Sequence, residues 1–168
     1  MSKKGFIVLV GALVCYLSSF AQEKFGHVNS REIMQIMPEF SEAKKKIETE
    51  SAQYETILNN LRNELNNKYA AFQQEQEGLS EGVKAMKIKE IQEVEQRTQN
   101  FYDEARQNID KLQEQLMVPI QEKLVKAIQA VGDENGFTSI IETYAAIYLS
   151  PTKMVDVSSL VKAKLGIK

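Results

Sequence analysis

The sequence predicts a mostly α-helical protein in which a long antiparallel coiled-coil hairpin is attached to a small β-containing body. Apolar or small side chains recur every three or four residues through residues 38–72 and again through residues 91–128, which is the spacing of a coiled-coil seam. Between these stretches, Gly78 and Gly82 are the only glycines from residue 38 to residue 131, and glycine is typical of turns. After Gly136 the helical spacing gives way to short β-rich runs, which predict the body.

The first residues have the pattern of a secretory signal peptide. Lys3 and Lys4 precede an apolar run that ends at Leu17, and small side chains lead up to Ala21 and Gln22. We therefore expect residues 1–21 to be removed by cleavage between Ala21 and Gln22 and the mature chain to be exported. An uncleaved anchor is the less favoured alternative, because the apolar run is shorter than the roughly 20 residues that span a bilayer.

The mature chain then begins with the first part of the body, residues 22–37. Residues 25–29 are typical of a short strand, and Asn29 with Glu32 forms a capping pair for a helix from Ser30 to Ile36. Pro38 suits the first position of the next, long helix.

We predict the hairpin arm over residues 38–118, with its tip near residues 78–82. Its helices share an inward-facing seam on which every apolar position predicts contact with the other helix. The seam positions are Phe40, Ala43, Ile47, Ser51, Tyr54, Leu58, Leu61, Leu65, Tyr69 and Phe72, then Ile91, Val94, Thr98, Phe101, Ala105, Ile109, Leu112, Leu116, Ile120, Leu124 and Ile128. On the outer faces, Glu64 before Lys68 and Glu93 before Arg97 predict ion pairs within one helix, each contributing roughly 0.2–0.5 kcal/mol.

The second part of the body covers residues 119–168. Pro119 predicts a kink or break between arm and body, and Gly136 predicts the end of the long helix. Two strands are expected over residues 137–141 and 146–149. Asp156 is expected to cap a last helix with Val157, Leu160, Val161 and Leu165 on one face.

Three short strands and one helix make a marginal core, and their open edges favour pairing with copies of the same chain. We therefore expect an obligate homo-oligomer closed by a shared barrel. The oligomerisation candidates are the apolar residues of the predicted strands, Phe25, Val28, Ile140, Ile141, Ile147 and Leu149.

The whole mature chain resembles the Skp/OmpH family of periplasmic chaperones. The similarity is closest in residues 26–30 leading to Met37-Pro38-Glu39, in residues 119–123 leading to residues 135–137, and in residues 146–148 and 156–157. The resemblance implies a trimer whose strands form a central barrel and whose three arms surround a cavity for unfolded outer-membrane proteins, without ATP. The best-known members have strongly basic arms. Residues 38–131 here contain 13 basic and 17 acidic residues, which does not favour electrostatic capture of acidic clients or lipopolysaccharide.

A holdase needs accessible, dispersed apolar surface and no reacting group. The client-binding candidates are arm residues off the predicted seam, although any one of them is more commonly an ordinary surface or seam residue. These candidates are Ile57, Ala71, Met86, Ile88, Tyr102 and Met117.

Other function classes are not favoured by the composition. His27 is the only histidine and the mature chain has no cysteine, so a metal site of the usual nitrogen and sulfur ligands is not expected within one chain. No phosphate-binding loop, dinucleotide fingerprint or nucleophile motif occurs, so we expect neither a cofactor nor an enzyme. The mature chain has 19 basic and 23 acidic residues, which gives no reason to expect nucleic acid as a partner.

The sequence thus predicts an ATP-independent periplasmic holdase that binds unfolded outer-membrane proteins and prevents their aggregation. A peripheral contact with membrane or lipid is left open. The alternative is an envelope scaffold whose coiled coil binds one specific folded partner. The two functions differ in what they bind: a holdase acts on several unfolded proteins, whereas a scaffold acts on none of them.

Overall fold

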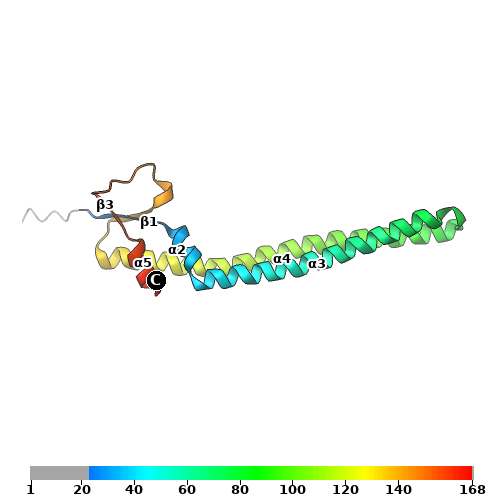
Figure 1. Cartoon of the computed structure of the whole chain (residues 1–168), viewed down its shortest axis with the longest axis horizontal. Helices are drawn as coiled ribbons and strands as arrows, with labels where there is room; N and C mark the ends of the chain where they lie inside the picture. Colours follow the sequence, from blue (N-terminus) through cyan, green and yellow to red (C-terminus); the bar gives the residue numbers. More distant parts are fainter. Residues whose placement is uncertain (1–22, 168) are drawn as a thin grey trace, which may run out of the picture. The chain divides into compact units, whose positions relative to one another are not determined.

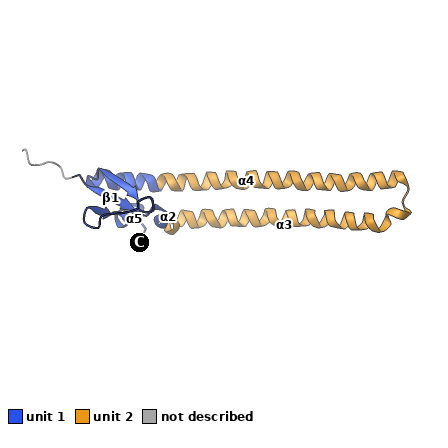
Figure 2. Ribbon diagram, turned by 90° about the horizontal axis from the view of Figure 1, so that it is seen from above, with its two compact units in different colours: residues 1–33, 124–168 blue, residues 34–123 orange. Residues whose placement is uncertain are grey.

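The computed structural model describes residues 23–167, so the predicted signal peptide and its cleavage site at Ala21 and Gln22 lie outside the described residues. The described chain is mostly helical with one small sheet, as predicted, and it divides into two compact units (Figures 1 and 2). The first unit ends at Ile33 and resumes at Leu124, and the second is Met34–Lys123. Within residues 23–167, no helix combines the length and apolarity that a membrane span requires.

The first unit contains a three-stranded sheet in the order β2-β1-β3. The central strand β1 (Phe25–Val28) pairs in parallel with β2 (Ser139–Glu142) on one side and with β3 (Met154–Asp156) on the other. Parallel neighbours cannot be joined by a tight turn, so each connection must cross over. The connection from β1 to β2 contains both long helices, and residues 143–153 connect β2 to β3 across the central strand.

At two positions in this unit, the local structure favours glycine. A Cβ atom on Gly26 would lie 3.2 Å from Ile140 Cγ1 and from the Phe137 ring, so the centre of the sheet requires glycine there. Gly136 has a φ of 65°, and it follows the long helix α4 (Glu81–Asn135). The Phe137 amide donates to the Gly132 carbonyl and the Gly136 amide to the Asp133 carbonyl, which together form a Schellman cap. The predicted helix end at Gly136 is confirmed.

The first unit has a small core of buried apolar side chains from four segments. They come from β1, from the short helix α2 (Ser30–Ile36), from the end of α4 and from the last helix α5 (Ser158–Leu165). The buried members are Val28, Ile33, Leu124, Ala127, Val131, Val157 and Val161. Segments far apart in the sequence therefore stabilise each other through shared apolar burial.

The second C-terminal strand lies later in the chain than predicted. Residues 146–149 are not a strand; they follow the short 3-10 helix η2 (Thr143–Ala145), and β3 forms at Met154–Asp156 instead. Ile147 and Tyr148 are almost fully exposed in the single chain. These apolar residues are therefore not part of the sheet of the single chain.

Asp156 caps the last helix broadly as predicted. Its carboxylate accepts a hydrogen bond of 2.9 Å from the Ser158 amide, although Val157 occupies the N-cap position. On the face predicted for this helix, Val157 and Val161 are buried, whereas Leu160 is exposed in the single chain. The helix ends at Gly166, which has a φ of 73°.

This cap predicts a pH-dependent contribution to stability. The hydrogen bond from Ser158 lowers the pKa of the Asp156 carboxyl from its ordinary value. A lowered folded-state pKa adds stability above the unfolded-state pKa near 4, and this is lost as pH falls through the folded-state value. We expect Asp156→Ala to cost about 1 kcal/mol at pH 7 in urea unfolding, and the difference to shrink below pH 4. An equal cost at pH 7 and pH 3 would contradict the role of the charged carboxylate.

The capping pair predicted at the start of α2 is confirmed. The Glu32 amide donates to Asn29 Oδ1 at 3.1 Å, and Asn29 Nδ2 donates to Glu32 Oε2 at 3.2 Å. The Ser30 amide donates to the Glu142 carboxylate at 3.3 Å, and the Asn29 amide to the Ser158 hydroxyl at 3.4 Å. The cap of α2 is thus also attached to β2 and α5.

The second unit is the predicted helical hairpin. Helix α3 (Pro38–Glu75) leads through a short 3-10 helix η1 (Gln76–Gly78) into α4, and the two long helices run antiparallel side by side (Figures 1 and 2). The predicted seam is confirmed by burial, because its positions are buried or half-buried with the single exception of Tyr69. Tyr54 and Phe101 show the contact directly, with ring centroids 5.8 Å apart.

The turn lies where the glycines predict it, but for a different reason. Neither Gly78 nor Gly82 has a positive φ, and Gly82 already belongs to the first turn of α4. The chain reverses through η1, Leu79 and Ser80, and the Ser80 carbonyl accepts the first helical hydrogen bond from Lys84. A Cβ atom at either glycine would meet nothing within 4 Å.

Pro119 does not break α4, which continues unbroken from Glu81 to Asn135. A proline within a helix removes one hydrogen bond and costs about 3 kcal/mol. Ile120, the next residue, is buried against the hairpin seam, and such packing stabilises long helices more than local propensity does. The prediction of a break is therefore wrong.

Candidate client-binding surface

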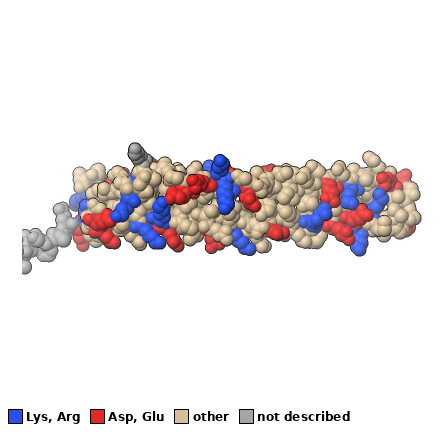
Figure 3. Space-filling view, turned by 90° about the horizontal axis from the view of Figure 1, so that it is seen from below, with Lys and Arg blue, Asp and Glu red and all other residues tan. Residues whose placement is uncertain are grey.

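The two arm helices are joined by ion pairs that cross the hairpin. Lys68 pairs with Glu90 and Lys87 with Glu75, each at 2.8 Å. Two further pairs across the hairpin join Arg97 to Glu64 and Lys123 to Glu39. Figure 3 shows the outcome on one face, where basic and acidic side chains stand next to each other and stretches of other residues lie between them.

These pairs correct the prediction of ion pairs within one helix. Glu64 contacts Arg97 and Lys68 contacts Glu90, each across the hairpin, while Glu93 pairs with Lys89 one turn earlier at 3.8 Å. Spacing along one helix cannot show which residues the second helix brings near. The cross-hairpin pairs place opposite charges of α3 and α4 next to each other and neutralise them.

Hydrogen bonds across the hairpin shift the pKa values of three side chains. The hydrogen bond from Lys123 lowers the pKa of Glu39, and the hydrogen bond from Lys68 lowers the pKa of Glu90. Tyr69 donates a 2.7 Å hydrogen bond to Glu95, which raises the pKa of the Tyr69 hydroxyl. Glu39 and Glu90 are carboxylates and Tyr69 is a neutral hydroxyl at pH 7 already at their ordinary pKa values, and each shift moves the pKa further from neutrality.

Three of the predicted client-binding residues lie on one flank of the hairpin. Ala71 is half-buried and lines an open groove together with Asn60 and Glu90. Ile57 precedes Asn60 by about one helical turn, and Met86 precedes Glu90 by about one turn, which places them on the same side. Ile57 and Met86 are exposed, Met86 by 61%.

The other three lie on the opposite flank. Tyr102 is exposed and lines a second groove, of about 360 Å³, with Tyr54 and Arg106. Ile88 is exposed and lies four turns before Tyr102 on α4. Met117 is half-buried and lies about three turns after Arg106 on the same side.

The structure therefore does not bring the six candidates together on one surface of a single arm. It divides them into a first flank with Ile57, Ala71 and Met86, and a second flank with Ile88, Tyr102 and Met117. A client segment that touches one face of one arm meets only one of these two sets. Sequence spacing alone did not separate them, because the partner helix decides which side of each helix faces outward.

The predicted oligomerisation residues lie in the first unit. Phe25 and Ile141 are partly exposed and Ile147 is fully exposed, while Ile140 and Leu149 are half-buried. Val28 is 2% exposed and belongs to the core of the single chain. Sequence reasoning missed Tyr144 and Tyr148, which are 63% and 77% exposed beside them. Both tyrosines lie in an apolar run that forms no strand, and this is the signal by which they can be recognised.

His27 occupies a structural position on the central strand. Its Nδ1 and the Thr143 hydroxyl lie 3.0 Å apart in a hydrogen bond between β1 and η2. Among residues 23–167, no group of three or more histidine, cysteine, aspartate or glutamate side chains is arranged to hold a metal ion.

Comparisons with known proteins agree with this architecture. The sequence model of the family described as outer membrane protein (OmpH-like) matches residues 24–165. Compared with curated proteins, the chain has no significant match. A crystal structure of a proposed OmpH-like outer membrane chaperone from Caulobacter crescentus CB15 is similar to the chain with a TM-score of 0.71 and 14% sequence identity, covering 86% of this chain and 85% of that one.

At 14% identity the structural likeness supports the fold, whereas the family match covers most of the sequence itself. The fold found here, a small sheet with a long helical hairpin inserted between its strands, is shared with that relative. The chain therefore belongs to the OmpH-like family, the Skp/OmpH chaperone family that its sequence resembles.

Proposed function

We propose that this protein is an ATP-independent periplasmic holdase that keeps unfolded outer-membrane proteins from aggregating. Family membership supports a role with outer-membrane proteins. The observation that carries the holdase proposal is the pattern of exposed apolar side chains on the arm. They are spread along both helices and consist of Ile57, Tyr69, Val83, Met86, Ile88, Tyr102 and Val118.

Dispersion is the property that matters for this function. A contiguous apolar patch larger than a few hundred Å² promotes self-association, whereas separated side chains stay soluble and still contact an unfolded chain at several points. Methionine adapts its shape and tyrosine combines a ring with a polar end, so both suit varied clients. Each contact is weak, which allows release without an energy source.

We further propose that the functional form is a homo-oligomer, with three chains as implied by the family resemblance. The edge strands β2 and β3 have one unpaired side each, and the exposed apolar residues Tyr144, Ile147 and Tyr148 lie between them in the sequence. Both features favour association with further copies. The arms of several chains then present their flanks to a shared space.

Replacing Ile57, Ile88 and Tyr102 together by serine is expected to weaken client binding roughly tenfold, because partial burial of three apolar side chains is lost. Binding is measured as the apparent Kd for an unfolded β-barrel membrane protein diluted from urea. The matched control replaces three exposed apolar residues outside the α3/α4 pairing, Ile36, Val125 and Leu160, and is expected to change the Kd by less than about twofold. Equal effects in both variants would contradict a role for the arm.

Two smaller variants separate the flanks. Ile57→Ser with Met86→Ser removes the first flank, and Ile88→Ser with Tyr102→Ser removes the second. A loss confined to one pair identifies the flank that faces the client, while similar losses show that clients use both.

A further inference from the structure

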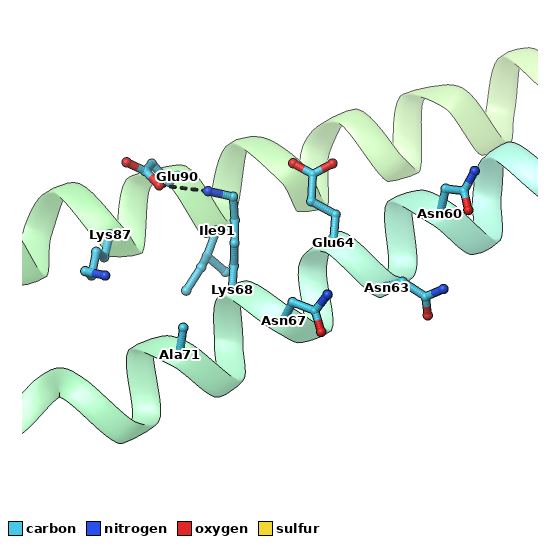
Figure 4. A pocket seen from close by; sticks show the side chains of 9 residues that line it. All are labelled: Asn60, Asn63, Glu64, Asn67, Lys68, Ala71, Lys87, Glu90 and Ile91. Atoms are coloured by element: carbon cyan, nitrogen blue, oxygen red, sulfur yellow. Dashed lines mark hydrogen bonds and ion pairs between the residues drawn. The ribbon is translucent and has the colours of Figure 1, made fainter.

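The first flank of the arm carries an open groove of about 590 Å³ between α3 and α4. Its floor is apolar and contains Ile91, which is only 4% exposed, and half-buried Ala71. Its sides carry charged and amide side chains, shown in Figure 4. Which of these polar groups can bind a ligand depends on which of them lack a partner within the arm.

The charged groups of the groove are already paired. Lys68 donates to Glu90 and Lys87 donates to Glu75, each at 2.8 Å, and Glu64 pairs with Arg97. An ion pair between fixed partners offers little net charge to a ligand. The groove is therefore close to neutral despite its charged lining.

The amide groups of the groove are free. Asn60, Asn63 and Asn67 follow one another along α3, and none has a hydrogen-bond partner within the described part of the chain (Figure 4). A primary amide carries two N–H donors and one carbonyl acceptor. The polar groups of the groove that remain available are thus uncharged amides, each of which has both donors and an acceptor.

We propose that this asparagine row binds the main chain of an extended polypeptide segment. The inference rests on the proposed holdase function and specifies how the arm holds a client. Every residue of an unfolded chain except proline offers one N–H and one C=O, which is the complement of a primary amide. Such binding does not depend on the client's sequence.

The spacing of the row fits an extended chain. Asn63 and Asn67 are four residues apart on a helix, so their Cα atoms are separated by about 6 Å along the axis. In an extended chain, groups that face the same side repeat every two residues, or about 6.6–6.8 Å. Asn63 and Asn67 are therefore placed to contact alternate peptide groups of one segment, while a small apolar client side chain covers Ala71 and Ile91.

The sequence provides a matched control for testing this row. Asn59 and Asn66 are exposed, have the same spacing as Asn60 and Asn67, and do not line the groove. The double variant Asn60→Ala with Asn67→Ala removes groove amides, and Asn59→Ala with Asn66→Ala removes the same groups beside it. Both variants gain the same helix propensity, so differences in helix stability cancel.

The first readout is the apparent Kd of the mature protein for an unfolded β-barrel membrane protein. We expect the groove variant to bind roughly tenfold more weakly, and the control variant to bind within about twofold of the unchanged protein. Indistinguishable Kd values for the two variants would overturn the proposal while leaving the holdase function intact.

The second readout uses a main-chain probe and does not depend on holdase activity. A neutral peptide of alternating glycine and serine is added to the 15N-labelled mature protein, and the side-chain amide signals of Asn60 and Asn67 are followed by NMR. We expect these signals to shift clearly more with the peptide than with its N-methylated analogue, which lacks the glycine N–H donors.

The two readouts separate the two claims. Shifted asparagine signals in a protein that holds no client would support the groove and contradict the holdase. Equal shifts with both peptides, no shift with either, or shifts caused only by a neutral oligosaccharide would overturn main-chain recognition.

Discussion

Replacing Leu124 by alanine is expected to lower the free energy of unfolding by about 2–5 kcal/mol. Leu124 is 2% exposed and lies in the core of the first unit, where α4 meets residues from β1, α2 and α5. Truncation removes its buried methyl groups and leaves a cavity, and both effects destabilise the unit. Urea unfolding followed by circular dichroism, at one protein concentration, measures the change.

Leu160→Ala is the matched control for this variant. Leu160 belongs to the same unit, and its side chain is 40% exposed, so its truncation is expected to cost less than about 1 kcal/mol. The sequence pattern placed Leu160 on one face of the last helix together with Val157 and Val161. A cost for Leu160→Ala equal to that for Leu124→Ala would contradict the core described here.

Replacing Ile147 by lysine is expected to convert the proposed oligomer into single chains at micromolar concentration. The Ile147 side chain is fully exposed in one chain, so the substitution leaves the fold of that chain unchanged. In an oligomer it would introduce a buried, unpaired charge, which costs several kcal/mol at each interface. Sedimentation equilibrium measures the mass, and circular dichroism measures the helix content.

The control substitution is Val118→Lys, which adds the same charge at an exposed apolar position on the arm. We expect its mass to equal that of the unchanged protein. Two results would argue against the interface: an Ile147→Lys protein that remains oligomeric, or an unchanged protein that is already a single chain.

The arm could be predicted from the sequence because its helical pattern depends on residues that are close together in the chain. Seam residues such as Leu58, Leu65 and Ile109 recur at the helical period, and that period follows directly from helix geometry. The caps at Asn29 and Gly136 were predictable for the same reason, since each depends on a few neighbouring residues. Local rules of this kind need no knowledge of the partner element.

The strand order and the ion pairs depend on contacts between distant residues. β3 forms at Met154–Asp156 because that segment reaches the free side of β1, whereas residues 146–149 have stronger strand propensity but form no strand in the single chain. Likewise Glu64 pairs with Arg97 because the hairpin brings them together, although Lys68 is nearer in sequence. Propensity is a weak guide when pairing is non-local.

The sequence predicted which residues form the candidate site, but it did not predict how they are arranged on the arm. Four of the six off-seam residues are exposed, and Ala71 and Met117 are half-buried, but their division into two flanks follows from the antiparallel register. The asparagine row has no signal in the sequence that distinguishes it from a solvent-facing helix surface. Its significance depends on the pairing of Lys68 and Lys87 with acidic residues, which leaves the amides as the free polar groups of the groove.

The most direct test of the holdase account is aggregation of an unfolded β-barrel membrane protein diluted from urea, with and without the mature chain, while the mass of the chain is measured alongside. The account predicts suppression that saturates near one oligomer per client, by a protein whose mass is close to three chains. No suppression by an intact, helical oligomer would contradict it and would favour a scaffold that binds one folded partner.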